Sequence, residues 1–270
     1  MVVKKFLYEE MSWPELRDVV KEDRVVVVPV GMLEDHGLHL PVVTDVMITG
    51  AVCRRAAEGV PDSVVLMPVQ QHGYSPHHMD FSGSITVKGP TLIEYMLDVT
   101  RSLVRHGFRR ILIVNGHGSN MPWLEAAARM TIVENPNVLC ALVAWWAIPE
   151  LAEEVRRLRS SERGGMSHAC ELETSMMLAI RPELVEMEKA VRDMSYQTSK
   201  YLPPRDFYYP TGPIIMMPYW STMSRTGTLG DPTKATREKG ERWLSAAVQG
   251  LTGIIKEFRG LEIKERVDHH

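Results

Sequence analysis

Residues 24–30 read RVVVVPV, and this run of mostly β-branched side chains decides the fold class of the chain. A strand whose successive side chains are all apolar belongs in a sheet covered on both faces, which is typical of parallel sheets. Similar runs follow at residues 63–67, 110–114 (RILIV) and 138–144 (VLCALVA). We therefore predict four buried strands, with the first of them central.

Helical patterns separate these runs. Between Pro90 and Gly107, an apolar stripe that includes Leu92, Met96 and Leu103 predicts one helix. Chain-breaking Gly or Pro residues delimit further helices, which we expect at residues 45–58, 121–134, 149–160, 172–180 and 234–258. The alternation of strands and helices predicts an α/β fold with a mostly parallel central sheet.

The segment 186–232 follows neither the strand period nor the helix period. It contains YLPPRDFYYPTGP, rich in Pro and Tyr, and we predict a long ordered loop that passes over a site. No repeat, low-complexity tract or linker divides the chain, so we expect one domain over residues 1–266. Residues 267–270 (VDHH) resemble the start of an expression tag, and His269 and His270 are left out of the site.

Composition excludes several classes of function. The 31 basic and 34 acidic side chains give a net charge of -3, which argues against nucleic acid or an anionic membrane as a partner. Cys53, Cys140 and Cys170 are far apart and form no C-x-x-C pair, so we expect free thiols in a reducing, cytoplasmic compartment. The first residues lack the apolar core of a signal peptide, and no apolar run is long enough to span a membrane.

Polar residues follow two of the predicted strands, where functional groups of parallel sheets gather. Glu34 and His36 follow the first strand, Asp45 begins the next helix, and His117 follows the RILIV strand within NGHGSN. Taken singly, each has a structural explanation: a solvated turn for Glu34 and His36, a helix cap for Asp45, a hydrogen-bonded loop for His117. Together they predict a divalent cation site for Zn²⁺, Mn²⁺ or Fe²⁺.

A third cluster, SHACELETS at residues 167–175, enters an apolar helix. His168 and Glu173 are spaced so that both can face one cavity. The alternative is a capping arrangement built on Ser167 or Thr174. Cys170 has no nucleophile signature around it and is expected to be a small buried thiol.

Two more stretches are candidates for contact with a substrate. QHGYSPHHMDFSGS, at residues 71–84, holds three histidines without metal-ligand spacing, and we expect His78 or its neighbours to touch substrate. Trp145 and Trp146 follow a strand, where they could line a pocket or pack in the core.

GMLEDHGLHLPVVTD, HHMDFSGSI, NGHGSN, HACELETS and the later GTLGDP resemble, in this order, the motifs of the creatininase (creatinine amidohydrolase) family. The resemblance implies a three-layer α/β/α fold, a divalent-metal centre that is often binuclear, hydrolysis of small amides and a homohexamer. It makes ligands of Glu34, His36, Asp45 and His117, with Asp45 bridging two ions. His168 and Glu173 match the site residues of the family's second half.

Three departures set this chain apart from creatinine-hydrolysing members. Ser119 stands where they carry a metal-binding glutamate, Cys170 replaces a glycine, and residues 201–220 form an unusual Tyr- and Pro-rich segment. We therefore expect a small-molecule substrate other than creatinine, with one or two ions per subunit. His78, Ser119, Trp146 and Tyr208 are the expected substrate contacts.

The expected reaction is metal-assisted hydrolysis of a small polar amide, linear or cyclic. His168 would protonate the leaving group, and Glu173 would either complete the metal shell or accept the water proton. A carbon–carbon ring-opening hydrolase of a cyclic polyol ketone is the first alternative, with Arg205, Tyr208 and Tyr209 binding hydroxyl groups. A formamide deformylase and a binding protein without activity are the others.

Overall fold

Four parallel strands form the central sheet of the computed structural model, which describes residues 4–270. Their order is β2-β1-β3-β4. The bounds agree closely with the four predicted strands: β1 (Val25–Val30), β2 (Val64–Leu66), β3 (Arg110–Asn115) and β4 (Leu139–Ala144). The continuous apolar runs thus formed strands because both faces of the sheet are covered.

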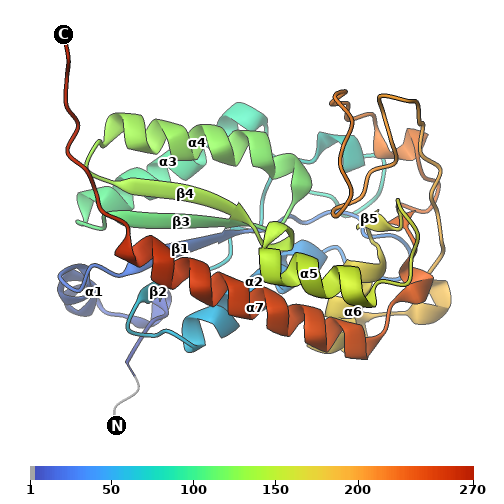
Figure 1. Cartoon of the computed structure of the whole chain (residues 1–270), viewed down its shortest axis with the longest axis horizontal. Helices are drawn as coiled ribbons and strands as arrows, with labels where there is room; N and C mark the ends of the chain where they lie inside the picture. The colour runs from blue at the N-terminus through green and yellow to red at the C-terminus, as the bar shows by residue number, and fades with distance from the viewer. Residues whose placement is uncertain (1–3) are drawn as a thin grey trace.

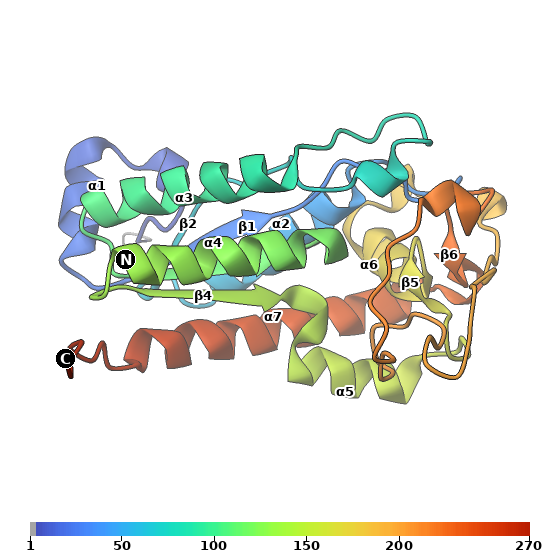
Figure 2. The ribbon, with the colours of Figure 1, turned by 90° about the horizontal axis from the view of Figure 1, so that it is seen from above.

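Helices cover the sheet on both faces and make a three-layer sandwich, which confirms the expected fold class (Figures 1 and 2). One face carries α3 (Gly89–Arg105) and α4 (Met121–Glu134), and the other carries α2 (Thr44–Glu58) and α7 (Arg237–Gly260). The side chains of β1 alternate between the two layers. Val25 and Val27 pack with α2 and α7, whereas Val26, Val28 and Val30 pack with α3 and α4.

Three further helices complete the described chain: α1 (Trp13–Val20), α5 (Pro149–Leu158) and α6 (Glu171–Ile180). Helix α1 was not predicted from the sequence; it begins at a capping box between Ser12 and Glu15. The last helix begins later than predicted. Residues 232–234 form a separate 3₁₀ turn, and Thr236 caps α7 by accepting a hydrogen bond from the Lys239 amide at 3.2 Å.

A small antiparallel sheet lies beyond the carboxyl ends of the central strands. It pairs β5 (Met166–His168) with β6 (Leu229–Gly230), and neither short strand was predicted. Apart from β6, the segment 186–232 runs as irregular chain and short 3₁₀ turns around this end of the molecule, drawn in gold to orange in Figures 1 and 2. Both features place chain from the second half of the sequence over the ends of β1 and β3.

No helix among residues 4–270 combines the length and the apolar character that crossing a bilayer would require.

Candidate metal centre

The predicted ligands come from four places in the fold and meet in one buried cluster. Glu34 and His36 follow β1, Asp45 lies in the first turn of α2, His117 follows β3, and Glu173 lies in the first turn of α6. Each side chain is at most 7% exposed. The solvated turn considered for Glu34 and His36 is therefore wrong.

Asp45 belongs to two groups of potential ligand atoms. Within each group, all the ligand atoms lie within 4.8 Å of one another. One group joins it to His36 and Glu173, and the other joins it to Glu34 and His117. Its Oδ1 lies 3.3 Å from His36 Nε2, and its Oδ2 lies 3.2 Å from His117 Nδ1. One carboxylate oxygen therefore faces each group, as a carboxylate between two ions requires.

Asp45 does not cap its helix. The N-cap residue of α2 is Val43, and no side chain caps this end by hydrogen bonding. The cap considered for Asp45 is wrong because its carboxylate turns inward to the two imidazoles. His117 joins the same cluster, since its Nδ1 lies 3.0 Å from Glu34 Oε1.

Beyond ion-pair contacts within the cluster, four of its buried polar atoms have no hydrogen-bond partner among residues 4–270: Glu34 Oε1, His36 Nε2, Asp45 Oδ2 and His117 Nε2. Each such atom costs roughly 1–3 kcal/mol, and more where the group is charged. A divalent cation would satisfy the first three. Carboxylate oxygen together with imidazole nitrogen suits Zn²⁺, Mn²⁺ or Fe²⁺, so the residues present fit a metal ion.

Opposite charges balance within the cluster when no ion is bound. Burial opposes the charge on Glu34, but nearby imidazoles, chiefly His117, hold its pKa well below the usual range. Burial likewise opposes the imidazolium of His36, yet Asp45 raises its pKa to about 10. The pKa of His117 rises to about 10 against burial, because Glu34 and Asp45 attract its proton. A metal ion therefore competes with protons for these side chains.

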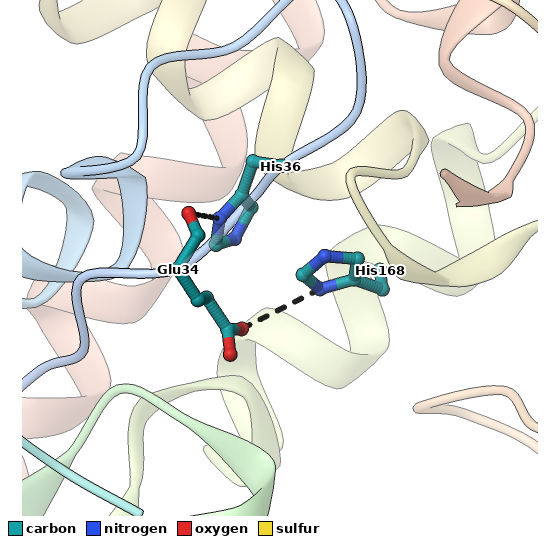
Figure 3. A group of neighbouring side chains, drawn as sticks. All are labelled: Glu34, His36 and His168. Carbon is teal, nitrogen blue, oxygen red and sulfur yellow. Dashed lines mark hydrogen bonds and ion pairs between the residues drawn. The ribbon is translucent and has the colours of Figure 1, made fainter. Parts of the chain in front are cut away.

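Hydrogen bonds to atoms that do not face the rest of the cluster orient the two proposed ligands that follow β1. Ser75 Oγ donates to Glu34 Oε2 at 2.6 Å, and both residues are fully buried. His36 Nδ1 lies 3.3 Å from the backbone oxygen of Glu34 (Figure 3). A proton on Nδ1 leaves Nε2 free for a cation, which is the usual state of a histidine ligand.

The end of β3 fixes His117 in a similar way. The Asn115 side chain accepts a hydrogen bond from the His117 amide at 3.1 Å and donates to its carbonyl oxygen at 2.7 Å. Between them, Gly116 lies against α2, and a Cβ there would come within 1.9 Å of Thr49 Oγ1. Glycine is required because the strand passes so close to the helix that carries Asp45.

His168 approaches Glu34 from β5, and its ring lies beside that of His36, with 4.4 Å between the centroids (Figure 3). Its Nδ1 lies 3.7 Å from Glu34 Oε1, and its Nε2 lies 2.8 Å from the backbone oxygen of Asp35. The next residue, Ala169, has a φ of +48°, a region that alanine rarely occupies. Strained backbone of this kind is concentrated at functional sites.

Glu173 combines the two arrangements expected for its helix. Its Oε2 accepts a hydrogen bond from the Cys170 amide at 3.2 Å and so caps α6, while its Oε1 lies 4.0 Å from His36 Nε2. The caps considered at Ser167 and Thr174 are wrong, because Cys170 occupies the N-cap position. Burial and the charge of Glu173 raise the pKa of Cys170 well above its usual range, as expected of an inert thiol.

Two residues that support this cluster, Asp35 and Ser75, were not predicted from the sequence to do so. Asp35 lies 2.5 Å from His78 through Oδ1 and Nδ1, and the His78 ring stacks on Trp220 at 4.4 Å between centroids. Asp35 stands between two predicted ligands in the sequence, which was the available signal. Ser75 lies within the histidine-rich stretch but had no pattern to mark it.

A cavity of about 330 Å³ opens on the cluster. His78, Ser119 and Trp146 line it, so they stand where the sequence analysis expected substrate contacts, whereas Trp145 is buried in the core. Tyr208 does not line it. A turn at Asp206, whose Oδ1 accepts from the Tyr208 amide at 3.0 Å, leaves Tyr208 packed against the core.

Phe207 lines the cavity in place of Tyr208. Much of the remaining wall comes from residues 202–220, so the irregular segment does pass over the site as expected.

Comparison with known proteins identifies relatives along nearly the whole chain. The family model for creatininase, described as creatinine amidohydrolase, matches residues 9–255. Creatinine amidohydrolase of Pseudomonas putida is 31% identical, over 94% of this chain and 97% of the relative. The mycofactocin precursor peptide peptidase of Mycolicibacterium smegmatis is 32% identical, over 87% and 85%. The 3-dehydro-scyllo-inosose hydrolase of Thermotoga maritima is 26% identical, over 93% and 83%.

Solved structures agree with these relatives. A manganese form of creatininase superposes with a TM-score of 0.80 at 30% identity, covering 94% of this chain and 98% of that chain. A zinc–zinc form of a creatininase variant superposes with a TM-score of 0.79 at 30% identity, with the same coverage.

Proposed function

The chain belongs to the creatininase family of metal-dependent hydrolases, and from this premise we propose that it hydrolyses the C–N bond of a small polar amide, linear or cyclic. One observation carries the proposal. Asp45 faces two groups of buried carboxylates and imidazoles, and both groups border the cavity. This arrangement can hold one or two divalent ions next to a bound amide.

The proposed ligands are Glu34, His36, Asp45, His117 and Glu173. A bound divalent ion would lower the pKa of water and polarise a substrate carbonyl. The ion is Zn²⁺, Mn²⁺ or Fe²⁺ by ligand type, and solved relatives carry manganese or zinc. Glu173 supports this set because its second oxygen, Oε1, is directed toward His36 rather than into the helix cap.

His168 is the proposed proton donor to the leaving nitrogen. It lines the cavity, and its Nε2 proton is held by the Asp35 carbonyl oxygen, so Nδ1 is the atom free to exchange a proton. Burial and His36 oppose its positive charge, yet Asp35 and Glu34 raise the pKa of His168 above its usual value. The ring therefore holds a second proton that it can deliver when the C–N bond breaks.

The walls of the cavity favour an amide over the alternative reaction on a cyclic polyol ketone. A polyol needs several hydrogen-bonding groups, whereas Trp146, Phe207 and residues 214–217 present mainly apolar surface. Tyr208, expected to bind a polyol hydroxyl, lies outside the cavity. A formamide meets the same requirements as other amides and stays within the proposal. The five proposed ligands are all present, and of the metal-ligand positions only Ser119 departs from the residue expected by family resemblance, which argues against a binding protein without activity.

The direct test is metal analysis of the purified protein together with a substrate screen read by product mass. We expect stoichiometric metal, hydrolysis of at least one class among creatinine, formamides and N-acyl compounds, and loss of both in Asp45→Ala. Chelation should abolish turnover, and added metal should restore it. Full turnover without stoichiometric metal would refute the proposal, and turnover of cyclic polyol ketones alone would favour the alternative.

We also propose that residues 1–266 form one domain, with a tag remnant at residues 267–270, and that the chain works in the cytoplasm as a homo-oligomer, a hexamer by family resemblance. All three cysteines are buried free thiols, which suits a reducing compartment. Ile215 and Tyr219, at 100% and 57% exposure, leave apolar surface at the cavity rim that another subunit could cover.

A further inference from the structure

Much of the cavity wall outside the metal-ligand cluster comes from one irregular segment, residues 202–220. Its side chains are mostly apolar and include Phe207, Trp220 and the run Ile-Ile-Met-Met at residues 214–217. Trp146 extends this surface from the end of β4, with its ring centroid 5.5 Å from that of Phe207. A ligand that fills the cavity therefore places an apolar group against this wall.

Arg205 is the one arginine among the described residues that line this cavity. Its guanidinium donates to the backbone oxygen of Met216 and, at 3.0 Å, to Met217 Sδ. Within residues 4–270, no carboxylate lies at ion-pair distance from it. Arg205 is half-buried, and this burial, opposed by Tyr196, lowers the pKa of its guanidinium.

The neighbouring acidic residue cannot serve as that partner. Asp206 is already paired with Arg159, whose two terminal nitrogens lie 3.0 and 2.9 Å from its two oxygens. It also accepts from the amides of Gly164 and Tyr208. Asp206 is thus fully occupied, which leaves the Arg205 guanidinium available to an anionic group of a ligand in the cavity.

We propose that Arg205 binds the carboxylate of the substrate, so that the substrates are N-acyl derivatives of apolar amino acids, short peptides included. The inference rests on the proposed hydrolase function. The apolar side chain packs against Trp146, Phe207 and residues 214–217, and the amide carbonyl faces the metal ligands. Water oxygen bonds to the carbonyl carbon, the C–N bond breaks, and the leaving nitrogen takes a proton.

A purely structural role for Arg205 makes a different prediction. Its hydrogen bond to Met216 ties two parts of the segment together, so its removal could disturb the wall for every ligand alike. A carboxylate contact instead affects only ligands that carry the carboxylate. Comparing a carboxylate substrate with its neutral carboxamide separates the two roles.

The experiment measures kcat/KM of the metal-loaded full chain for N-acetylphenylalanine and for N-acetylphenylalaninamide, through the mass of the released amine. We expect the carboxylate to be preferred by roughly 10-fold to 100-fold, mainly through KM, because a hydrogen bond to a charged group is lost in the carboxamide. Arg205→Met should bring this ratio close to one. Arg205→Lys should keep part of it, because lysine retains the charge but not the two-pronged geometry.

Arg163→Met is the matched control. Arg163 also donates to a backbone oxygen of the segment, that of Pro210 at 3.1 Å, but it does not line the cavity. It should keep the wild-type preference. Equal kcat/KM of the wild type for the two compounds would overturn the proposal, as would an equal loss of both in Arg205→Met with the preference unchanged.

Two further outcomes separate this inference from the function on which it rests. Hydrolysis of creatinine or a formamide but of neither N-acyl compound would overturn the carboxylate site and leave the hydrolase standing. Failure of the metal-loaded protein to hydrolyse any amide would overturn both.

Discussion

Ser75→Ala tests whether the hydrogen bond behind Glu34 sets the affinity of the metal centre. The Ser75 hydroxyl donates to Glu34 Oε2 at 2.6 Å, and neither side chain is exposed to solvent. Without it, that oxygen is left buried and unpaired, and Glu34 is free to rotate away from Asp45. A hydrogen bond to a charged group contributes about 1.5–3 kcal/mol.

Since every 1.4 kcal/mol is about tenfold in binding, the metal Kd should rise roughly 10-fold to 150-fold. Mutations of such supporting residues typically cost about 10–100-fold in affinity, in agreement with this range. The assay is competition with a chromophoric chelator at fixed pH. Ser119→Ala is the control, because the Ser119 hydroxyl contacts His77 at 3.1 Å instead of Glu34.

The control should stay within about threefold of the wild type, which is well below the cost of a lost charged hydrogen bond. A Ser75→Ala protein that is folded and binds metal as tightly as the wild type would refute the reasoning.

Three other predictions follow from the geometry. Asp45→Asn should empty both ligand groups. Metal analysis should then find less than about a tenth of the wild-type metal content, since a disturbed ligand costs on the order of tenfold or more in metal affinity. A variant that keeps its full metal content would contradict a carboxylate shared by the two groups. Gly116→Ala should lower the free energy of unfolding by about 1–3 kcal/mol in urea titration, whereas Gly118→Ala, with nothing within 4 Å of its added Cβ, should change it by less than about 0.5 kcal/mol. Metal affinity should fall as pH falls, because the pKa of each of His36 and His117 is about 10 in the absence of an ion. Below that value the ion must displace a proton from each ring, so the metal affinity should fall by up to about tenfold per pH unit for each proton displaced. Chelator competition at several pH values measures this dependence, and an affinity that does not change with pH would contradict it.

Most of the central sheet could be predicted because β1, β3 and β4 each contain six residues and come from largely apolar runs. RVVVVPV and RILIV are buried on both faces, so their sequence reports their environment directly. The strands β5 and β6 contain three and two residues, too few for any period to appear. Their pairing is a tertiary contact between distant parts of the chain, which no local pattern records.

The grouping of the proposed metal ligands could be predicted because residue type, position in the βα units and family motif all agree. Glu34 and His117 follow strands, Asp45 begins a helix, and the structure groups all three. Tyr208 was placed wrongly because, within irregular chain, the direction of a side chain depends on turns such as the one at Asp206. That Arg205 has no acidic partner among residues 4–270 likewise depends on tertiary contacts, which the sequence alone does not show.

Regular and irregular parts of the chain contribute different parts of the site, and this affects how the specificity of the molecule can be altered. The proposed ligands lie at strand ends and helix starts, whereas much of the cavity wall is supplied by residues 202–220, which contain no strand and only the first residue of a 3₁₀ turn. Replacing that stretch would alter which molecules are admitted without refolding the scaffold beneath. A new substrate selectivity could therefore be engineered by exchanging residues 202–220 while the proposed metal ligands stay unchanged.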